Sequence, residues 1–182
     1  MSFLPSKADN YTLINLLLEY ADFTRPLVEF TESVMRGPSP FSELQRETIF
    51  AYLSGLNGCR FCQMSHTVAI EALGGSSGCI QDLLIGQYPD DMAEEMRPVL
   101  DYARKMNSEL EEISQIDINA VLKAGWDEVA VVHIAYICGL ANLYNRIVSG
   151  LGIPPDEEIM KRGGMMMAND GYLGINAMLK AS

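Results

Sequence analysis

The sequence predicts an all-α protein, a bundle of about eight to ten helices that forms a single domain over residues 1–182. Two observations support this class. Apolar residues recur at spacings of three and four along most of the chain, which is the period of an amphipathic helix, and no segment alternates as a half-buried strand does. Capping residues and glycine or proline stops then divide the chain into segments of helical length.

The first helices are bounded by these local signals. Apolar spacing predicts one helix over residues 11–23. Thr24 as N-cap and Pro26 in the first turn predict the start of a second helix, because proline suits the first turn, where no N–H is needed. Gly37-Pro38 predicts its end.

The next two helices flank an Asn-Gly break. Ser42 and Gln45 have the spacing of a capping box and predict the start of a helix that turns Ile49, Phe50, Leu53 and Leu56 inward. Asn57-Gly58 ends it. Another helix is predicted over residues 59–73 and is stopped by Gly74-Gly75.

The second half follows the same pattern. Helices are expected over residues 80–85, from Asp90 or Asp91 to about residue 106, over residues 114–124 and over residues 127–149. After Pro154-Pro155 the chain restarts at Asp156 and is expected to loosen at Gly163-Gly164. Two interpretations of the segment after about residue 155 stay open: an arm that packs on a neighbouring subunit, and a flexible surface end.

Charge and hydropathy restrict the partners. The formal net charge of -11 argues against nucleic acid and against an anionic membrane, since both require a basic surface. The start of the chain lacks the basic and apolar regions of a signal peptide. The most apolar run, residues 129–143, is interrupted by His133 and Gly139 and is short for a membrane span. We therefore expect a cytoplasmic protein without a membrane partner.

The candidate chemistry lies in Cys59, Cys62 and His66. On a helix these positions share one face, and residues three apart have Cβ atoms about 5–6 Å apart, close enough for a reducible disulfide after slight adjustment. Two signals favour different sulfurs as the thiolate. The positive end of the helix dipole favours Cys59, whereas a histidine one turn later favours Cys62. Spacing alone leaves their roles open.

Glu47 precedes Cys59 on the preceding helix, near the face that packs inward. A carboxylate there could orient His66 or relay a proton. Arg46 and Glu43 are comparably placed, so helical geometry does not by itself select Glu47.

The segment from Glu47 to His66 resembles the signature of the AhpD-like alkylhydroperoxidases in the carboxymuconolactone decarboxylase family, in particular their peroxidase-related branch. In that family a Glu is followed by Cys-x-x-Cys and then by His, and all four positions match Glu47, Cys59, Cys62 and His66. The stretch over residues 142–154 also resembles that branch. One position departs: AhpD has a second His directly before the second Cys, where this chain has Phe61.

This resemblance implies an AhpD-like helical bundle that assembles as a trimer or hexamer. It also implies that Cys62 attacks a hydroperoxide, that Cys59 resolves the product as a disulfide, and that Glu47 and His66 relay protons. No metal or other cofactor is expected in the subunit, because the dithiol itself carries the electrons. An outside dithiol, such as a lipoyl-bearing or thioredoxin-like protein, would then restore the thiols.

Other interpretations remain beside this one. The same superfamily contains lyases that act on carboxymuconolactone-type substrates, which would not need the dithiol. A metal-stabilised interaction module would use Cys59, Cys62, His66 and one further ligand. Outside the motif, the structural interpretation is preferred: His133 as a hydrogen-bonded core or interface residue, Cys79 and Cys138 as small buried hydrophobes, and Asn145-Arg146 as a structural or subunit-contact pair.

Overall fold

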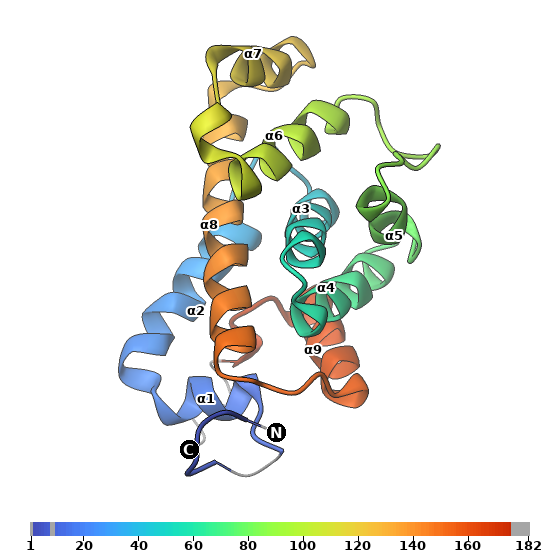
Figure 1. Ribbon diagram of the computed structural model, residues 1–182. Helices are drawn as coiled ribbons and strands as arrows, with labels where there is room; N and C mark the ends of the chain where they lie inside the picture. The colour runs from blue at the N-terminus through green and yellow to red at the C-terminus, as the bar shows by residue number, and fades with distance from the viewer. Residues whose placement is uncertain (1, 8–9, 176–182) are drawn as a thin grey trace.

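The computed structural model describes residues 2–7 and 10–175, and within them it contains nine α-helices, one short 3-10 helix and no β-strand (Figure 1). The predicted fold class and the predicted number of helices are confirmed. The α-helices are α1 (Leu13–Glu19), α2 (Ala21–Met35), α3 (Glu43–Leu56), α4 (Arg60–Ala72), α5 (Cys79–Leu84), α6 (Met96–Ser108), α7 (Gln115–Lys123), α8 (Glu128–Gly150) and α9 (Glu157–Asp170). The 3-10 helix, Leu110–Glu112, joins α6 to α7.

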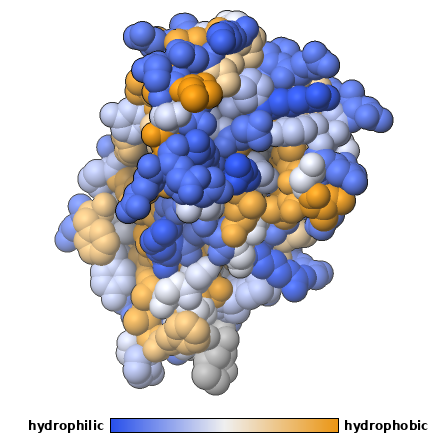
Figure 2. Space-filling model, turned by 45° about the horizontal axis from the view of Figure 1, so that its top comes forward, coloured by the Kyte–Doolittle hydropathy of each residue, from blue (hydrophilic) through white to orange (hydrophobic). Residues whose placement is uncertain are grey.

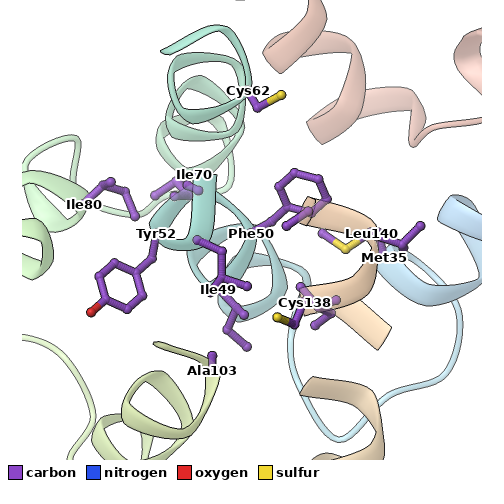
Figure 3. Close-up of a cluster of buried hydrophobic side chains, with 14 of the residues drawn as sticks. Met35, Ile49, Phe50, Tyr52, Cys62, Ile70, Ile80, Ala103, Cys138 and Leu140 are labelled. Carbon is purple, nitrogen blue, oxygen red and sulfur yellow. The ribbon is translucent and has the colours of Figure 1, made fainter. Parts of the chain in front are cut away.

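Helix α3 lies at the centre of the fold and packs against both α4 and α8 (Figure 1). Its predicted capping box is present, since the side chains of Ser42 and Gln45 each accept the other's backbone N–H. Every side chain from Arg46 to Ser54 is buried, and Figure 3 shows Ile49, Phe50 and Tyr52 pointing in different directions into the surrounding core. A polar side chain on this stretch must therefore find its partners inside the protein.

Helix α8 is the long central helix beside α3, and it also contacts α2, α4, α6 and α7. Among the described residues it is the one helix whose length and composition would allow it to cross a membrane. Nine of its side chains are buried, among them Ile134, Ile137 and Ala141. Core helices meet the same length and composition criterion, and α8 is packed as one.

Two predicted helix starts were wrong. Thr24 lies inside α2, and its hydroxyl donates to the carbonyls of Leu17 and Tyr20, so it stabilises the turn between α1 and α2 instead of capping a new helix. Helix α6 begins at Met96 rather than after Asp90 or Asp91. Pro98 then falls in the first turn of α6, where its missing N–H costs no intrahelical hydrogen bond.

The predicted loosening at Gly163-Gly164 was also wrong, because α9 continues through both residues. Helix α9 packs closely on α4 of the same chain (Figure 1). A Cβ at residue 164 would lie 2.4 Å from the carbonyl oxygen of Ser65 and 2.5 Å from the Cβ of Val68. Gly164 therefore permits the close approach of two helices, and α9 helps to enclose the region after Cys62.

Hydrophilic side chains cover most of the face in Figure 2, and hydrophobic ones form smaller patches between them. Exposed apolar side chains on α8 include Val129, Val132 and Tyr136. The main core lies around α3, α4 and α8, where the chemically interesting side chains are also found.

Candidate active site

The turn between α3 and α4 places Cys59. Gly58 has a φ of +67°, in the left-handed region that favours glycine, and this lets the chain reverse directly after α3. The backbone N–H of Cys59 then donates to the carbonyl of Ser54 at 2.9 Å. Cys59 becomes the N-cap residue of α4, and Cys62 follows inside the first turn.

Both cysteines are buried free thiols, and their sulfurs interact. The thiol of Cys62 donates toward Cys59 and, against the opposing effect of burial, lowers the pKa of Cys59 to about 6. The backbone N–H of Cys62 acts in the same direction, as expected at a helix N-terminus. The same hydrogen bond, together with burial, raises the pKa of Cys62. At rest the thiolate is thus favoured on Cys59 and the proton on Cys62.

Helix α8 supplies one polar group to each sulfur, four residues apart. The side chain of Asn145 lowers the pKa of Cys62, although by less than Cys59 and burial raise it. The hydroxyl of Ser149 contributes to lowering the pKa of Cys59. Asn145 is buried and also donates to the hydroxyl of Ser54 at 3.0 Å. It therefore faces the interior of its own chain and is not an exposed subunit contact.

Glu47 and His66 are hydrogen-bonded to each other, with His66 Nδ1 2.5 Å from Glu47 Oε2. The Glu47 side chain is 0% exposed. Its other oxygen, Oε1, accepts a hydrogen bond from the guanidinium of Arg36 at 2.6 Å. Burial would raise the pKa of Glu47, but the charge and hydrogen bond of His66, followed by those of Arg36, hold it below its ordinary value.

Two further side chains complete the surroundings of this pair. The ring of Phe50 stacks on the ring of His66 at 3.8 Å between centroids and fixes the plane of the imidazole. The hydroxyl of Tyr172, which follows α9, donates to Glu47 Oε1 at 3.0 Å. Burial and the charge of Glu47 raise the pKa of Tyr172 well above its usual value, so this hydroxyl remains a donor.

Cys62 and His66 line one apolar cavity of about 80 Å³. Its wall comes from α1, α3, α4, α8, α9 and the segment after α9, and Figure 3 shows the sulfur of Cys62 turned away from the α3 cluster, toward α9. The apolar lining residues are Leu13, Ile14, Leu17, Phe50, Phe61, Ile159, Met166, Met167 and Ile175. A thiol and an imidazole therefore meet in a space suited to an apolar molecule.

Cys59 lines a different hollow, which is formed by the α3–α4 turn, the end of α8 and the loop after it. Arg60, Ser149 and Pro154 border it, and Cys62 does not. Phe61 lines both spaces and lies between the two cysteines in the sequence. The two sulfurs of the dithiol thus border two different spaces.

The four residues singled out in the sequence all lie in this region: Glu47 contacts His66, Cys62 shares a cavity with His66, and Cys59 contacts Cys62. Sequence reasoning missed Arg36 and Tyr172. Arg36 is the residue after the end of α2, and Tyr172 lies 125 residues after Glu47, so no spacing rule connects either of them to the motif.

The other histidine and the other two cysteines have the contacts of structural residues. His133 is hydrogen-bonded to Ser39 and to the carbonyl of Val34, as expected for a satisfied histidine. Cys79 and Cys138 are buried, as predicted. In the part of the chain that the structure describes, no group of three or more His, Cys, Asp and Glu side chains is placed to hold a metal ion. The donor set for the metal-stabilised alternative is therefore not assembled in these ranges.

No model of a known protein family matches the sequence, and no curated protein matches it. Several solved structures do, among them two peroxidase-related proteins. A peroxidase-related protein from Silicibacter sp. TM1040 aligns over 80% of this chain and 76% of its own length, with a TM-score of 0.73 and 24% identity. A peroxidase-related protein from Ralstonia eutropha JMP134, described as an alkylhydroperoxidase AhpD core, aligns over 82% and 78%, with a TM-score of 0.73 and 21% identity. The chain therefore has the AhpD-like helical fold of these peroxidase-related proteins.

Proposed function

We propose that this protein is a thiol-dependent peroxidase that reduces organic hydroperoxides with the Cys59–Cys62 dithiol. The observation that carries the proposal is the apolar cavity that Cys62 shares with His66, whose Nδ1 is held by the buried carboxylate of Glu47. The AhpD-like fold supports it. A hydroperoxide that enters this cavity meets a sulfur nucleophile beside a proton-transfer group, which is the arrangement that such a reduction needs.

The first step requires Cys62 to lose its proton. Two acceptors are close: the Cys59 thiolate, toward which the Cys62 thiol already donates, and the imidazole of His66 in the same cavity. The Cys62 thiolate attacks the terminal oxygen of the hydroperoxide, and the O–O bond breaks. A proton delivered to the departing oxygen releases the alcohol and leaves Cys62 as a sulfenic acid.

The second step converts the sulfenic acid into a disulfide. The Cys59 thiolate attacks the sulfur of the Cys62 sulfenic acid, the S–O bond breaks, and the protonated oxygen leaves as water. The product is a Cys59–Cys62 disulfide. An outside dithiol then donates two electrons and two protons, is itself oxidised to a disulfide, and regenerates both thiols. We propose a lipoyl-bearing or thioredoxin-like protein as that reductant.

Turnover of cumene hydroperoxide with dihydrolipoamide tests the function. Cys62→Ser should abolish turnover, and Cys59→Ser should stop the cycle after one oxidation, with a sulfenic acid that dimedone labels at Cys62. Cys138→Ser is the matched control, because this thiol is buried on α8 but lines neither space beside the dithiol. Full activity in Cys62→Ser would overturn the role given to this sulfur.

A second candidate function is dithiol–disulfide exchange on small substrates. The surroundings of Cys59 favour it. Cys59 has the lowered pKa and lines the hollow beside Arg60, so a thiolate is available away from the apolar cavity. Reduction of glutathione disulfide by the reduced protein, measured beside hydroperoxide reduction, separates the two functions. Exchange without peroxide consumption would favour the second candidate.

A further inference from the structure

We propose that Tyr172 is a positioning residue of this site: its hydroxyl is delivered by a C-terminal clip fastened to α2, and it orients Glu47 toward His66. The clip is the segment of residues 171–173, directly after α9. The inference deepens the proposed peroxidase function and rests on it. It follows from three sets of contacts, which connect the clip to α2, α2 to Glu47, and Glu47 to His66.

The clip is held by Glu32 of α2. Its carboxylate oxygen Oε2 accepts the backbone N–H of Tyr172 at 2.6 Å and that of Leu173 at 3.2 Å. Gly171 precedes them with a φ of +68° and a ψ of -169°, a region that is essentially restricted to glycine. A Cβ at residue 171 would also lie 2.7 Å from Glu32 Oε2. Both the backbone conformation and the available space therefore require glycine where the clip meets Glu32.

Arg36, the residue directly after α2, lies one turn after Glu32 and connects the clip to the site. Its guanidinium carbon is 5.1 Å from the centroid of the Tyr172 ring, within the range of a cation–π contact. The same guanidinium donates to Glu47 Oε1 at 2.6 Å and to the carbonyl of Met167 on α9 at 2.8 Å. One helix thus fastens the clip and supplies a charged partner to the buried carboxylate.

The two oxygens of Glu47 have different partners. Oε1 accepts from Arg36 and from the Tyr172 hydroxyl, whereas Oε2 accepts from His66. With Oε1 occupied on two sides, the carboxylate is held so that Oε2 points at the imidazole. Because Glu47 is closed to solvent, no water replaces a donor that is removed. Loss of the Tyr172 hydroxyl should therefore change the hydrogen bond between Glu47 and His66.

The charged and titratable groups around Glu47 come from several elements. They are Arg36 at the end of α2, Arg46 from α3 itself, His66 from α4 and Tyr172 from the clip. Glu43 lies farther out, 3.6 Å from Arg36 Nε. Among these, Tyr172 is the group whose hydroxyl can be deleted without changing a charge.

Tyr172→Phe and Gly171→Ala test the inference in the full chain. The first deletes only the hydroxyl, and the second disturbs the clip at Glu32 without touching Glu47. Both weaken or remove a hydrogen bond to the carboxylate of Glu47, so Glu47 should take up a proton at higher pH. The acid limb of the pH–rate profile with cumene hydroperoxide should therefore move to higher pH, by about one unit and about tenfold in rate on the acid side. Both should also shift the Nδ1–H resonance of His66 in NMR spectra, which is easily assigned because the chain has only 2 His.

Tyr102→Phe is the matched control. It deletes the hydroxyl of another buried tyrosine, which lies on α6 and lines neither the cavity of Cys62 and His66 nor the hollow at Cys59. It should leave the acid limb and the His66 resonance in place. An unchanged limb and resonance in Tyr172→Phe, or a loss of rate that is equal at every pH with no change in the resonance, would reduce Tyr172 to a packing residue and overturn the inference.

The two proposals can fail separately. If the wild-type protein consumes no hydroperoxide, the proposed function fails, but the His66 resonance still reports the contact. A shifted resonance in Tyr172→Phe would then still support the positioning role. Normal wild-type turnover with an unchanged resonance in both clip variants would contradict the positioning role alone.

Discussion

His66 and Glu47 are 19 residues apart in the sequence, yet His66 Nδ1 lies 2.5 Å from Glu47 Oε2 at a position that solvent does not reach. The contact joins α3 to α4 next to Cys62. A buried carboxylate is unfavourable unless it is paired and hydrogen-bonded, and Glu47 satisfies this requirement through three donors. The same pairing that makes the site chemically useful therefore also carries part of the stability of the fold.

The first prediction concerns stability. Glu47→Gln should lower the free energy of unfolding by about 3 kcal/mol, because it leaves the guanidinium of Arg36 buried without its counter-charge. Urea unfolding of both proteins measures the difference. Glu43→Gln is the control: Glu43 is half-exposed and 3.6 Å from Arg36, so its loss should cost less than about 1 kcal/mol. Equal costs for the two variants would contradict the importance of the buried pair.

The second prediction concerns pH. The pKa of Glu47 in the native protein is below its ordinary value of 4.5, so the native state binds fewer protons than the unfolded state. The stabilisation from Glu47 should therefore be complete above that ordinary value and be lost as the pH falls through the lower native pKa. Urea midpoints followed between about pH 3 and pH 7 measure it. Glu47→Gln should lack this component, and an identical acid dependence in both proteins would contradict the assignment.

The third prediction concerns the two sulfurs. In a background without Cys79 and Cys138, ultraviolet absorbance should detect a thiolate that titrates with a pKa of about 6 and belongs to Cys59. Cys62→Ala should raise this pKa, because it removes the thiol that donates toward Cys59. Ser149→Ala should raise it less. A low pKa that persists in Cys59→Ala would assign the resting thiolate to Cys62 instead.

The fourth prediction compares two adjacent glycines. Gly164→Ala should destabilise the protein by about 1–3 kcal/mol, because the new methyl group would overlap the carbonyl of Ser65 on α4. Gly163→Ala should be stabilising by about 0.5–1 kcal/mol, since its Cβ would meet no neighbour and alanine favours a helix. Thermal unfolding of the two variants measures both signs. A similar loss in both would contradict the close α4–α9 contact.

Local signals in the sequence were sufficient for most of the fold. The capping box at Ser42, the Asn57-Gly58 break and the Gly74 stop act over a few residues, so they predicted real boundaries. Gly163-Gly164 led to the wrong prediction that the last helix loosens there. Gly164 is needed because the chain at this point lies close to Ser65, on a helix about a hundred residues earlier. A residue selected for close packing carries no local sign that distinguishes it from a helix breaker.

The candidate site was predictable in part for the same reason. Cys59, Cys62 and His66 lie close together in the sequence, and Glu47 was found through a resemblance rather than through geometry. Arg36 and Tyr172 reach Glu47 only through the packing of α2 and of the segment after α9. Such contacts depend on the tertiary fold, and neither residue belongs to a sequence motif from which its contact with Glu47 could be predicted.

The most direct test of the central claim is the intact mass and free-thiol count of the reduced protein before and after one equivalent of cumene hydroperoxide. The account predicts the loss of two mass units and two thiols, mapped to Cys59 and Cys62 and reversed by a dithiol. A protein whose mass and thiol count stay unchanged over minutes, or in which the oxidised residues are Cys79 or Cys138, would contradict it.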